Sequence, residues 1–190
     1  YCCICHLMVN TEFLTVSNPV NPLHVVGDSH CLPLAWRHIT MQTQERIMIP
    51  QLVTGLKIWH LRPESKFYPK VNFESIMSSI PNGSDIVMLL GEIDCREGFL
   101  VSVEKCKYET VEEAAGITID IFLAVLKTYS EKRGHTIYVH PVVPVLDETR
   151  HIVMVFNGVL KKKMQMEAIK NVHLLDFFDQ LLSRDVTLCS

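Results

Sequence analysis

Short apolar runs alternate with longer segments of helical periodicity along this chain of 190 residues. The runs have the length and the β-branched content of buried strands, and the segments between them are long enough to cross over to a parallel neighbour. The expected strands cover residues 23–26, 47–53, 85–90, 136–142 and 172–177. This βαβ order predicts an α/β domain with a mostly parallel five-stranded sheet.

The clearest helix lies between the third and fourth expected strands. Thr110 and Glu113 form a capping box, after which apolar side chains recur at steps of three and four residues. Gly134, preceded by two basic residues, predicts the end of this helix. A second helix is expected over residues 148–168, and its lysine run 161–163 indicates a solvated face.

Composition and charge narrow the class of protein. With 48% hydrophobic and 21% charged residues, the chain fits a single domain over residues 1–190, in which the N-terminal segment 1–20 is not firmly assigned. The net charge of −3 argues against a nucleic-acid-binding surface. Because no apolar run reaches the roughly 18 residues that span a bilayer, no membrane span is expected.

Seven cysteines, an odd number at irregular spacing, do not fit a disulfide-stapled secreted domain and favour a reducing compartment such as the cytoplasm. The cluster Cys2, Cys3, Cys5 and His6 is too tightly spaced for a zinc loop, and no second ligand pair follows it. We therefore expect a terminal strand there and no metal site.

Candidate chemistry follows the first three expected strands. The first is followed by Gly27-Asp28-Ser29-His30, the second by Thr54-Gly55 and the third by Gly91-Glu92-Ile93-Asp94. Open α/β sheets bind ligands at the carboxyl ends of their strands, so the Ser29 hydroxyl stands where a nucleophile would act. Acyl transfer by serine also requires a base and donors aimed at the developing oxyanion.

In order and spacing these blocks resemble those of the SGNH (GDSL-type) hydrolase family. The longer third block, Gly91-Glu92-Ile93-Asp94-Cys95-Arg96, is similar to a subgroup whose first block is Gly-Asp-Ser-His. The resemblance implies a flavodoxin-like three-layer sandwich. It also implies a serine esterase or acyltransferase that acts, without a cofactor, on a small acyl or acyl-sugar ester through an acyl-enzyme. Ser29 would be the nucleophile, and the backbone N–H groups of Ser29 and Gly55 would bind the oxyanion.

The third block departs from the family pattern. Ile93 stands where the family has an asparagine donor, and losing one oxyanion donor typically lowers turnover by about 10²–10³. Arg96 or a rotated Glu92–Asp94 loop could compensate. Alternatively, Asp94 and Arg96 pair structurally and brace the loop.

The absence of the family's catalytic base is a larger departure from the family pattern. The family's Asp-x-x-His block does not occur before Ser190. One expectation is that the dyad lies beyond Ser190, in which case these 190 residues alone are inactive. The alternative is an SGNH-like binding or scaffold domain that has lost hydrolysis.

Other histidines and charged residues are candidates for substrate binding. His140 ends the fourth expected strand and is the best candidate within the chain for the pocket, whereas His30 is expected to cap or pack, and His60 to pack beside Trp59. The substrate-binding candidates are Asp28, His30, His60, Asp94, Arg96 and His140.

The resemblance also predicts geometry. Ser29, Gly55 and the 91–96 loop should meet at one sheet edge, with Asp94 or Arg96 on its rim and no imidazole bonded to the Ser29 hydroxyl. A nucleotide-binding flavodoxin-like domain is the least favoured reading, because Gly27 is the only glycine near the first turn.

Overall fold

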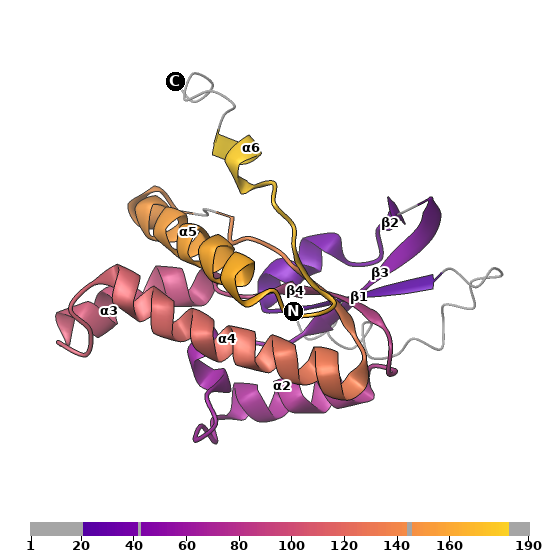
Figure 1. The fold of residues 1–190 in the computed structure, drawn as a ribbon, viewed down its shortest axis with the longest axis horizontal. Helices are drawn as coiled ribbons and strands as arrows, with labels where there is room; N and C mark the ends of the chain where they lie inside the picture. The colour runs from indigo at the N-terminus through magenta and orange to yellow at the C-terminus, as the bar shows by residue number, and fades with distance from the viewer. Residues whose placement is uncertain (1–20, 42, 144–145, 183–190) are drawn as a thin grey trace.

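The computed structural model describes residues 21–41, 43–143 and 146–182. They form a mixed α/β fold around one six-stranded sheet with the order β2-β3-β1-β4-β5-β6 (Figure 1). Every neighbouring pair of strands is parallel except β2 and β3. The strands are β1 (Asn21–Gly27), β2 (His38–Met41), β3 (Gln44–Leu52), β4 (Asp85–Leu89), β5 (Thr136–Val139) and β6 (Val172–Leu174).

The sixth strand, β2, corrects the expected count of five. After β1 the chain makes a 3₁₀ helix (Ser29–Leu34) and then turns back at Trp36, whose φ is 60° and whose N–H donates to the Met48 carbonyl at 2.8 Å. The returning segment pairs antiparallel with β3 at the edge of the sheet. Its four residues are exposed or half-buried, so it lacks the apolar run that marked the other strands.

The helices are α2 (Tyr68–Ser79), α3 (Phe99–Glu104), α4 (Val111–Arg133), α5 (Arg150–Glu167) and α6 (Phe178–Leu182). The predicted caps of α4 are confirmed: the Thr110 hydroxyl accepts from the Glu113 N–H at 3.1 Å, and Gly134 has a left-handed φ of 67°. The predicted second helix is α5, which begins two residues later than expected. None of the described helices combines the length and apolarity needed to cross a bilayer.

The main core lies between the sheet and the helices α2, α4 and α5. Val26, Met88 and Val139 occupy one register line across β1, β4 and β5, and all three are fully buried. The central rings of Phe122 on α4 and Phe156 on α5 are also fully buried in this cluster. Figure 1 shows α4 crossing between α2 and α5.

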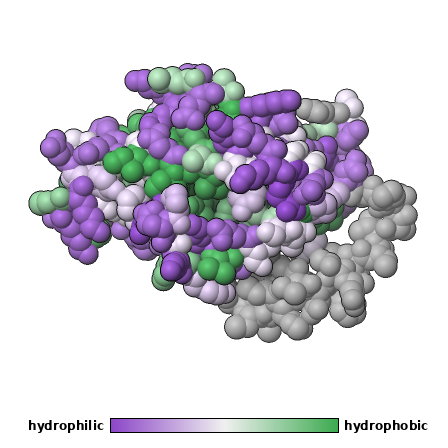
Figure 2. Space-filling model, turned by 60° about the horizontal axis from the view of Figure 1, so that its bottom comes forward, coloured by the Kyte–Doolittle hydropathy of each residue, from purple (hydrophilic) through white to green (hydrophobic). Residues whose placement is uncertain are grey.

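The other face of the central strands carries a smaller cluster. Val25 of β1 and Val87 of β4, paired in register, pack with Leu23 and with Cys31 of the 3₁₀ helix. The strands β1 and β4 are therefore buried on both faces, which fixes the positions of the loops that leave their carboxyl ends. On the outside, Figure 2 shows one face on which hydrophilic residues surround a hollowed apolar area.

Candidate functional site

The first block, Gly27-Asp28-Ser29-His30, leaves β1 in a sterically constrained conformation. A Cβ on Gly27 would lie 2.4 Å from the carbonyl oxygen of Leu89, so only glycine permits β1 and β4 to approach this closely. Asp28 then caps the 3₁₀ helix, because its Oδ1 accepts from the His30 N–H at 2.9 Å. Ser29 is the first residue of that helix and is exposed.

The second block leaves β3, the neighbour of β1 on one side. The Val53 N–H donates to the Gly27 carbonyl at 2.8 Å, which ties the ends of the two strands together. Gly55 follows in an exposed turn with a left-handed φ of 67°.

The third block leaves β4, the neighbour of β1 on the other side. Gly91 has a φ of 114°, and a Cβ there would lie 2.9 Å from side-chain atoms of both Phe156 and Val142. The chain continues into a single π-helical turn, Asp94–Gly98, a geometry that occurs frequently at functional sites.

Ser29, Gly55 and Gly91 thus follow three adjacent parallel strands at the same edge of the sheet. This agrees with the convergence expected from the sequence. The N–H groups of Ser29 and Gly55 donate no hydrogen bond to any other residue in the described ranges. Among the described residues, both are therefore available to an acceptor.

Asp94 lies in the interior rather than on the rim. Only 1% of its surface is exposed, and its carboxylate accepts from the N–H groups of Ile58 at 2.8 Å and Trp59 at 3.2 Å. Burial raises the pKa of Asp94 to about 7, against the opposing effect of these two hydrogen bonds. Asp94 therefore braces the loop after β4 against the loop after β3, and its assignment to substrate binding stays a prediction.

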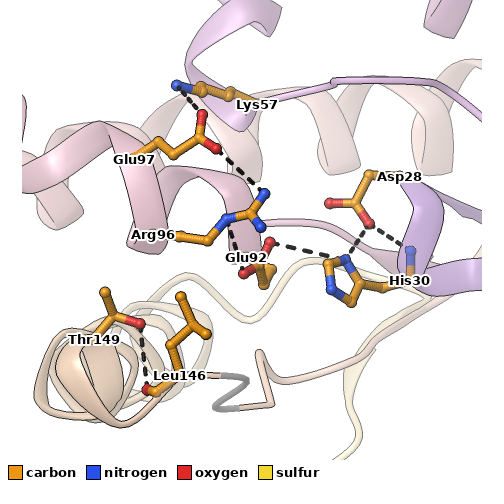
Figure 3. A network of polar contacts seen from close by, with 8 residues as sticks. All are labelled: Asp28, His30, Lys57, Glu92, Arg96, Glu97, Leu146 and Thr149. Atoms are coloured by element: carbon orange, nitrogen blue, oxygen red, sulfur yellow. Dashed lines mark hydrogen bonds and ion pairs between the residues drawn. The ribbon is translucent and has the colours of Figure 1, made fainter.

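In the part of the chain that the structure describes, Arg96 does not pair with Asp94, as one of the two alternatives had it, but with other carboxylates. Within the described residues, the Arg96 guanidinium lies 3.4 Å from Glu92 and 3.4 Å from Glu97. Arg96 is partly exposed and joins a chain of charged groups that runs along the sheet edge (Figure 3). Its members are Asp28, His30, Glu92, Arg96, Glu97 and Lys57.

His30 is at the centre of this network. Its Nδ1 lies 2.8 Å from Asp28 Oδ1 and 3.9 Å from Glu92 Oε2. Asp28 has no exposed surface, and Glu92 is 7% exposed. Burial raises the pKa of Glu92, with His30 and Arg96 acting in the opposite direction. Asp28, His30 and Glu92 could together supply metal ligands.

A cavity of about 340 Å³ opens beside His30. Its polar lining comes from His30, Glu92 and His140, and the rest of its wall is apolar. The structure thus places His140 and His30 on one cavity, as the position of His140 at the end of β5 suggested. The His140 Nδ1–H donates to the Pro141 carbonyl at 2.7 Å, and burial lowers the pKa of His140. The apolar lining residues are Pro33, Leu34, Leu89, Leu90, Pro141, Val142 and Val143.

His60 is not brought to this cavity. It accepts from the Lys57 N–H at 3.1 Å, and its ring meets the Phe67 ring edge-on at a centroid distance of 4.7 Å. Burial lowers its pKa. His60 lines a separate cavity of about 200 Å³ with Trp59 and Asp94, so its role in substrate binding stays a prediction.

Two residues important to the site were not singled out from the sequence. Glu92 had a usable signal, since it follows Gly91 at the end of a strand. Asn157 had none: its side-chain amide accepts from the Val142 N–H at 2.9 Å and donates to the Val142 carbonyl at 2.8 Å. This pair of bonds ties the cavity wall after β5 to helix α5.

No imidazole in the described ranges forms a hydrogen bond with the Ser29 hydroxyl. The dyad expected beyond Ser190, like the cysteine cluster at 2–6, lies outside the described residues. No protein-family model matches the chain, and no curated protein shows significant sequence similarity to it.

Proposed function

We propose that the protein is an SGNH-type serine esterase or acyltransferase with Ser29 as its nucleophile. The observation that carries this proposal is the meeting of three loops at one sheet edge. Ser29 is exposed at the end of β1, between the loops that contain Gly55 and Gly91. Ligands of open α/β sheets bind in this position.

The order of the parallel strands supports the proposal. Taken in chain order without β2, the strands β1, β3, β4, β5 and β6 lie in the spatial order 2-1-3-4-5, which is the flavodoxin-like order. The helices α2, α4 and α5 would be one outer layer of the proposed three-layer sandwich.

The reaction would begin with attack of Ser29 Oγ on an ester carbonyl. The carbonyl oxygen would gain negative charge and accept hydrogen bonds from the N–H groups of Ser29 and Gly55. A base would take the serine proton, the alcohol would leave as the acyl-enzyme forms, and water or an acceptor alcohol would release the acyl group. Ile93 cannot donate to the oxyanion, so two donors would serve where the family has three.

The cavity beside His30 suggests the kind of substrate. A volume of about 340 Å³ with an apolar wall suits a small acyl group. His30, Glu92 and His140 would meet the polar part of the ester or an acylated sugar.

A non-catalytic SGNH-like binding domain is the second candidate. Two observations favour it: Ile93 replaces a donor, and no described imidazole is bonded to Ser29. Such a domain would bind the same ligands in the cavity without turnover.

The two candidates differ in the effect of removing the Ser29 hydroxyl. Hydrolysis of p-nitrophenyl acetate and butyrate would be measured for the purified full-length protein, Ser29→Ala and the control Ser78→Ala. Ser78 is an exposed serine on α2, far along the chain from the site. The esterase proposal expects activity in the wild type and the control and only the buffer rate in Ser29→Ala. Equal rates in all three proteins would contradict it.

A further inference from the structure

Two loops bring three metal-ligating groups together beside the cavity. Asp28 and His30 follow β1, and Glu92 follows β4. One atom from each, a carboxylate oxygen or an imidazole nitrogen, lies within 4.8 Å of the other two. The pairing of Gly27 with Leu89 holds the two loops side by side, and Figure 3 shows the Asp28 and Glu92 carboxyl groups on two sides of the His30 ring.

The carboxylates also lack partners that their burial requires. Asp28 Oδ2 and Glu92 Oε2 are buried, and neither accepts a hydrogen bond from any group in the described ranges. The two side chains are 1% and 9% exposed. An unpaired buried carboxylate oxygen is unfavourable because it has lost water and gained no donor. Both unpaired oxygens belong to the groups that flank His30.

The guanidinium of Arg96 does not donate to either of these unpaired carboxylate oxygens. Arg96 Nε faces the other oxygen of Glu92, Oε1, at 3.4 Å, and its NH2 group lies 3.4 Å from Glu97. Among the described residues, Arg96 forms no ion pair with Asp28. In the described ranges Glu92 Oε2 lies 3.9 Å from His30 Nδ1, too far for a hydrogen bond, and Asp28 Oδ2 has no hydrogen-bond partner.

We propose that Asp28, His30 and Glu92 bind a zinc ion, with its remaining coordination position open to the cavity of about 340 Å³. Two carboxylate oxygens and one imidazole nitrogen are ligands that zinc accepts, and three protein ligands leave one position for water or substrate. Magnesium and calcium prefer oxygen ligands alone. The site shares His30 and Glu92 with the proposed substrate cavity, but its ligands do not include Ser29, so zinc binding does not require the ester chemistry proposed for Ser29.

Zinc binding would change the proton on His30. The ligand atom is Nδ1, now 2.8 Å from Asp28 Oδ1. Zinc would take the Nδ1 lone pair, so a proton on Nδ1 is released or replaced by one on Nε2. The Nε2–H would then be free to donate into the cavity.

Zinc affinity would be measured by competition with a chromogenic chelator for the metal-free protein, His30→Ala, Glu92→Gln and the controls His151→Ala and Ser29→Ala. Glu92→Gln preserves shape, and His151 is exposed on α5. We expect one zinc ion per wild-type chain, affinity lowered about tenfold or more in His30→Ala and Glu92→Gln, and no change in the two controls. Circular dichroism would show whether each variant is folded.

Cobalt(II) spectra would distinguish metal bound by Asp28, His30 and Glu92 from metal bound by cysteine thiolates. Cobalt bound to oxygen and nitrogen gives weak visible bands, whereas thiolate ligands add an intense near-ultraviolet band. The proposal expects the visible bands without the thiolate band, and expects Glu92→Gln to lose them. Unchanged zinc affinity in both folded ligand variants, a thiolate band, or no binding at millimolar zinc would overturn the proposal. Zinc binding retained by an inactive Ser29→Ala would keep the two proposals separate.

Discussion

Replacing Asp94 with alanine tests whether this carboxylate holds the loops of the site together. The side chain is buried and accepts from the N–H groups of Ile58 and Trp59 at 2.8 and 3.2 Å. Alanine would leave both donors without a partner. An unsatisfied buried donor costs about 1–3 kcal/mol. Ile58 is fully buried, but Trp59 is half-buried and can recover some hydration.

We therefore expect Asp94→Ala to lower the free energy of unfolding by about 2–4 kcal/mol. Asp94→Asn keeps the shape and one acceptor but turns an N–H group toward the second donor, so its loss should be smaller, at about 1–2 kcal/mol. The control is Asp147→Ala, which removes an exposed ion pair with Arg150 and should cost at most about 1 kcal/mol.

Urea unfolding followed by circular dichroism would give the free energies, provided the dependence on urea is the same in all variants. The expected order of loss is Asp94→Ala, then Asp94→Asn, then the control. A stability of Asp94→Ala within about 0.5 kcal/mol of the wild type, the range of ordinary surface substitutions, would refute the bracing role.

Three further changes test the scaffold of the site. Asn157→Ala removes both bonds to the Val142 backbone and should cost about 2–4 kcal/mol in urea unfolding, whereas a loss below 1 kcal/mol would contradict the role given to the pair. Gly91→Ala adds a Cβ 2.9 Å from neighbouring side chains at a φ of 114°, and it should lower the melting temperature by several degrees; an unchanged melting temperature would contradict the packing argument. Burial lowers the pKa of His24 and His135 from 6.5, so the unfolded state binds protons first. Each of these histidines therefore lowers stability as the pH falls below about 6.5, whereas the raised pKa values of Asp94 and Glu92 act in the opposite direction. His135→Phe should remove one histidine contribution, so the stability of the variant relative to the wild type should rise as the pH falls from about 7 to about 5; an unchanged difference would contradict it.

Local signals in the sequence predicted much of the fold. The capping box at Thr110 and the glycine at 134 located the ends of α4 within a residue, because both act on the nearest backbone groups. The five apolar runs located the parallel strands, most clearly β1 and β4, because strands buried on both faces need continuous apolar sequence. The edge strand β2 has no such requirement and was missed.

The candidate site was only partly predictable, because local sequence signals do not show which residues distant in the chain become partners. The position of Ser29 at the end of β1 followed from local pattern, whereas the partners of Asp94 lie 35 and 36 residues away in the chain. Which carboxylate faces His30 depends on the pairing of β1 with β4 and on the π-helical turn after Gly91. Neither the strand pairing nor the π-helical turn can be predicted from the residue spacing within a single sequence block.

The nucleophilicity of Ser29 is the central claim, and covalent labelling tests it most directly. The purified full-length protein would be treated with a fluorophosphonate, digested and mapped by mass spectrometry, with Ser29→Ala and Ser78→Ala treated in parallel. The account predicts one phosphonyl adduct on Ser29 in the wild type and in Ser78→Ala, and none in Ser29→Ala. Absence of an adduct on Ser29, or equal labelling of all three proteins, would contradict it.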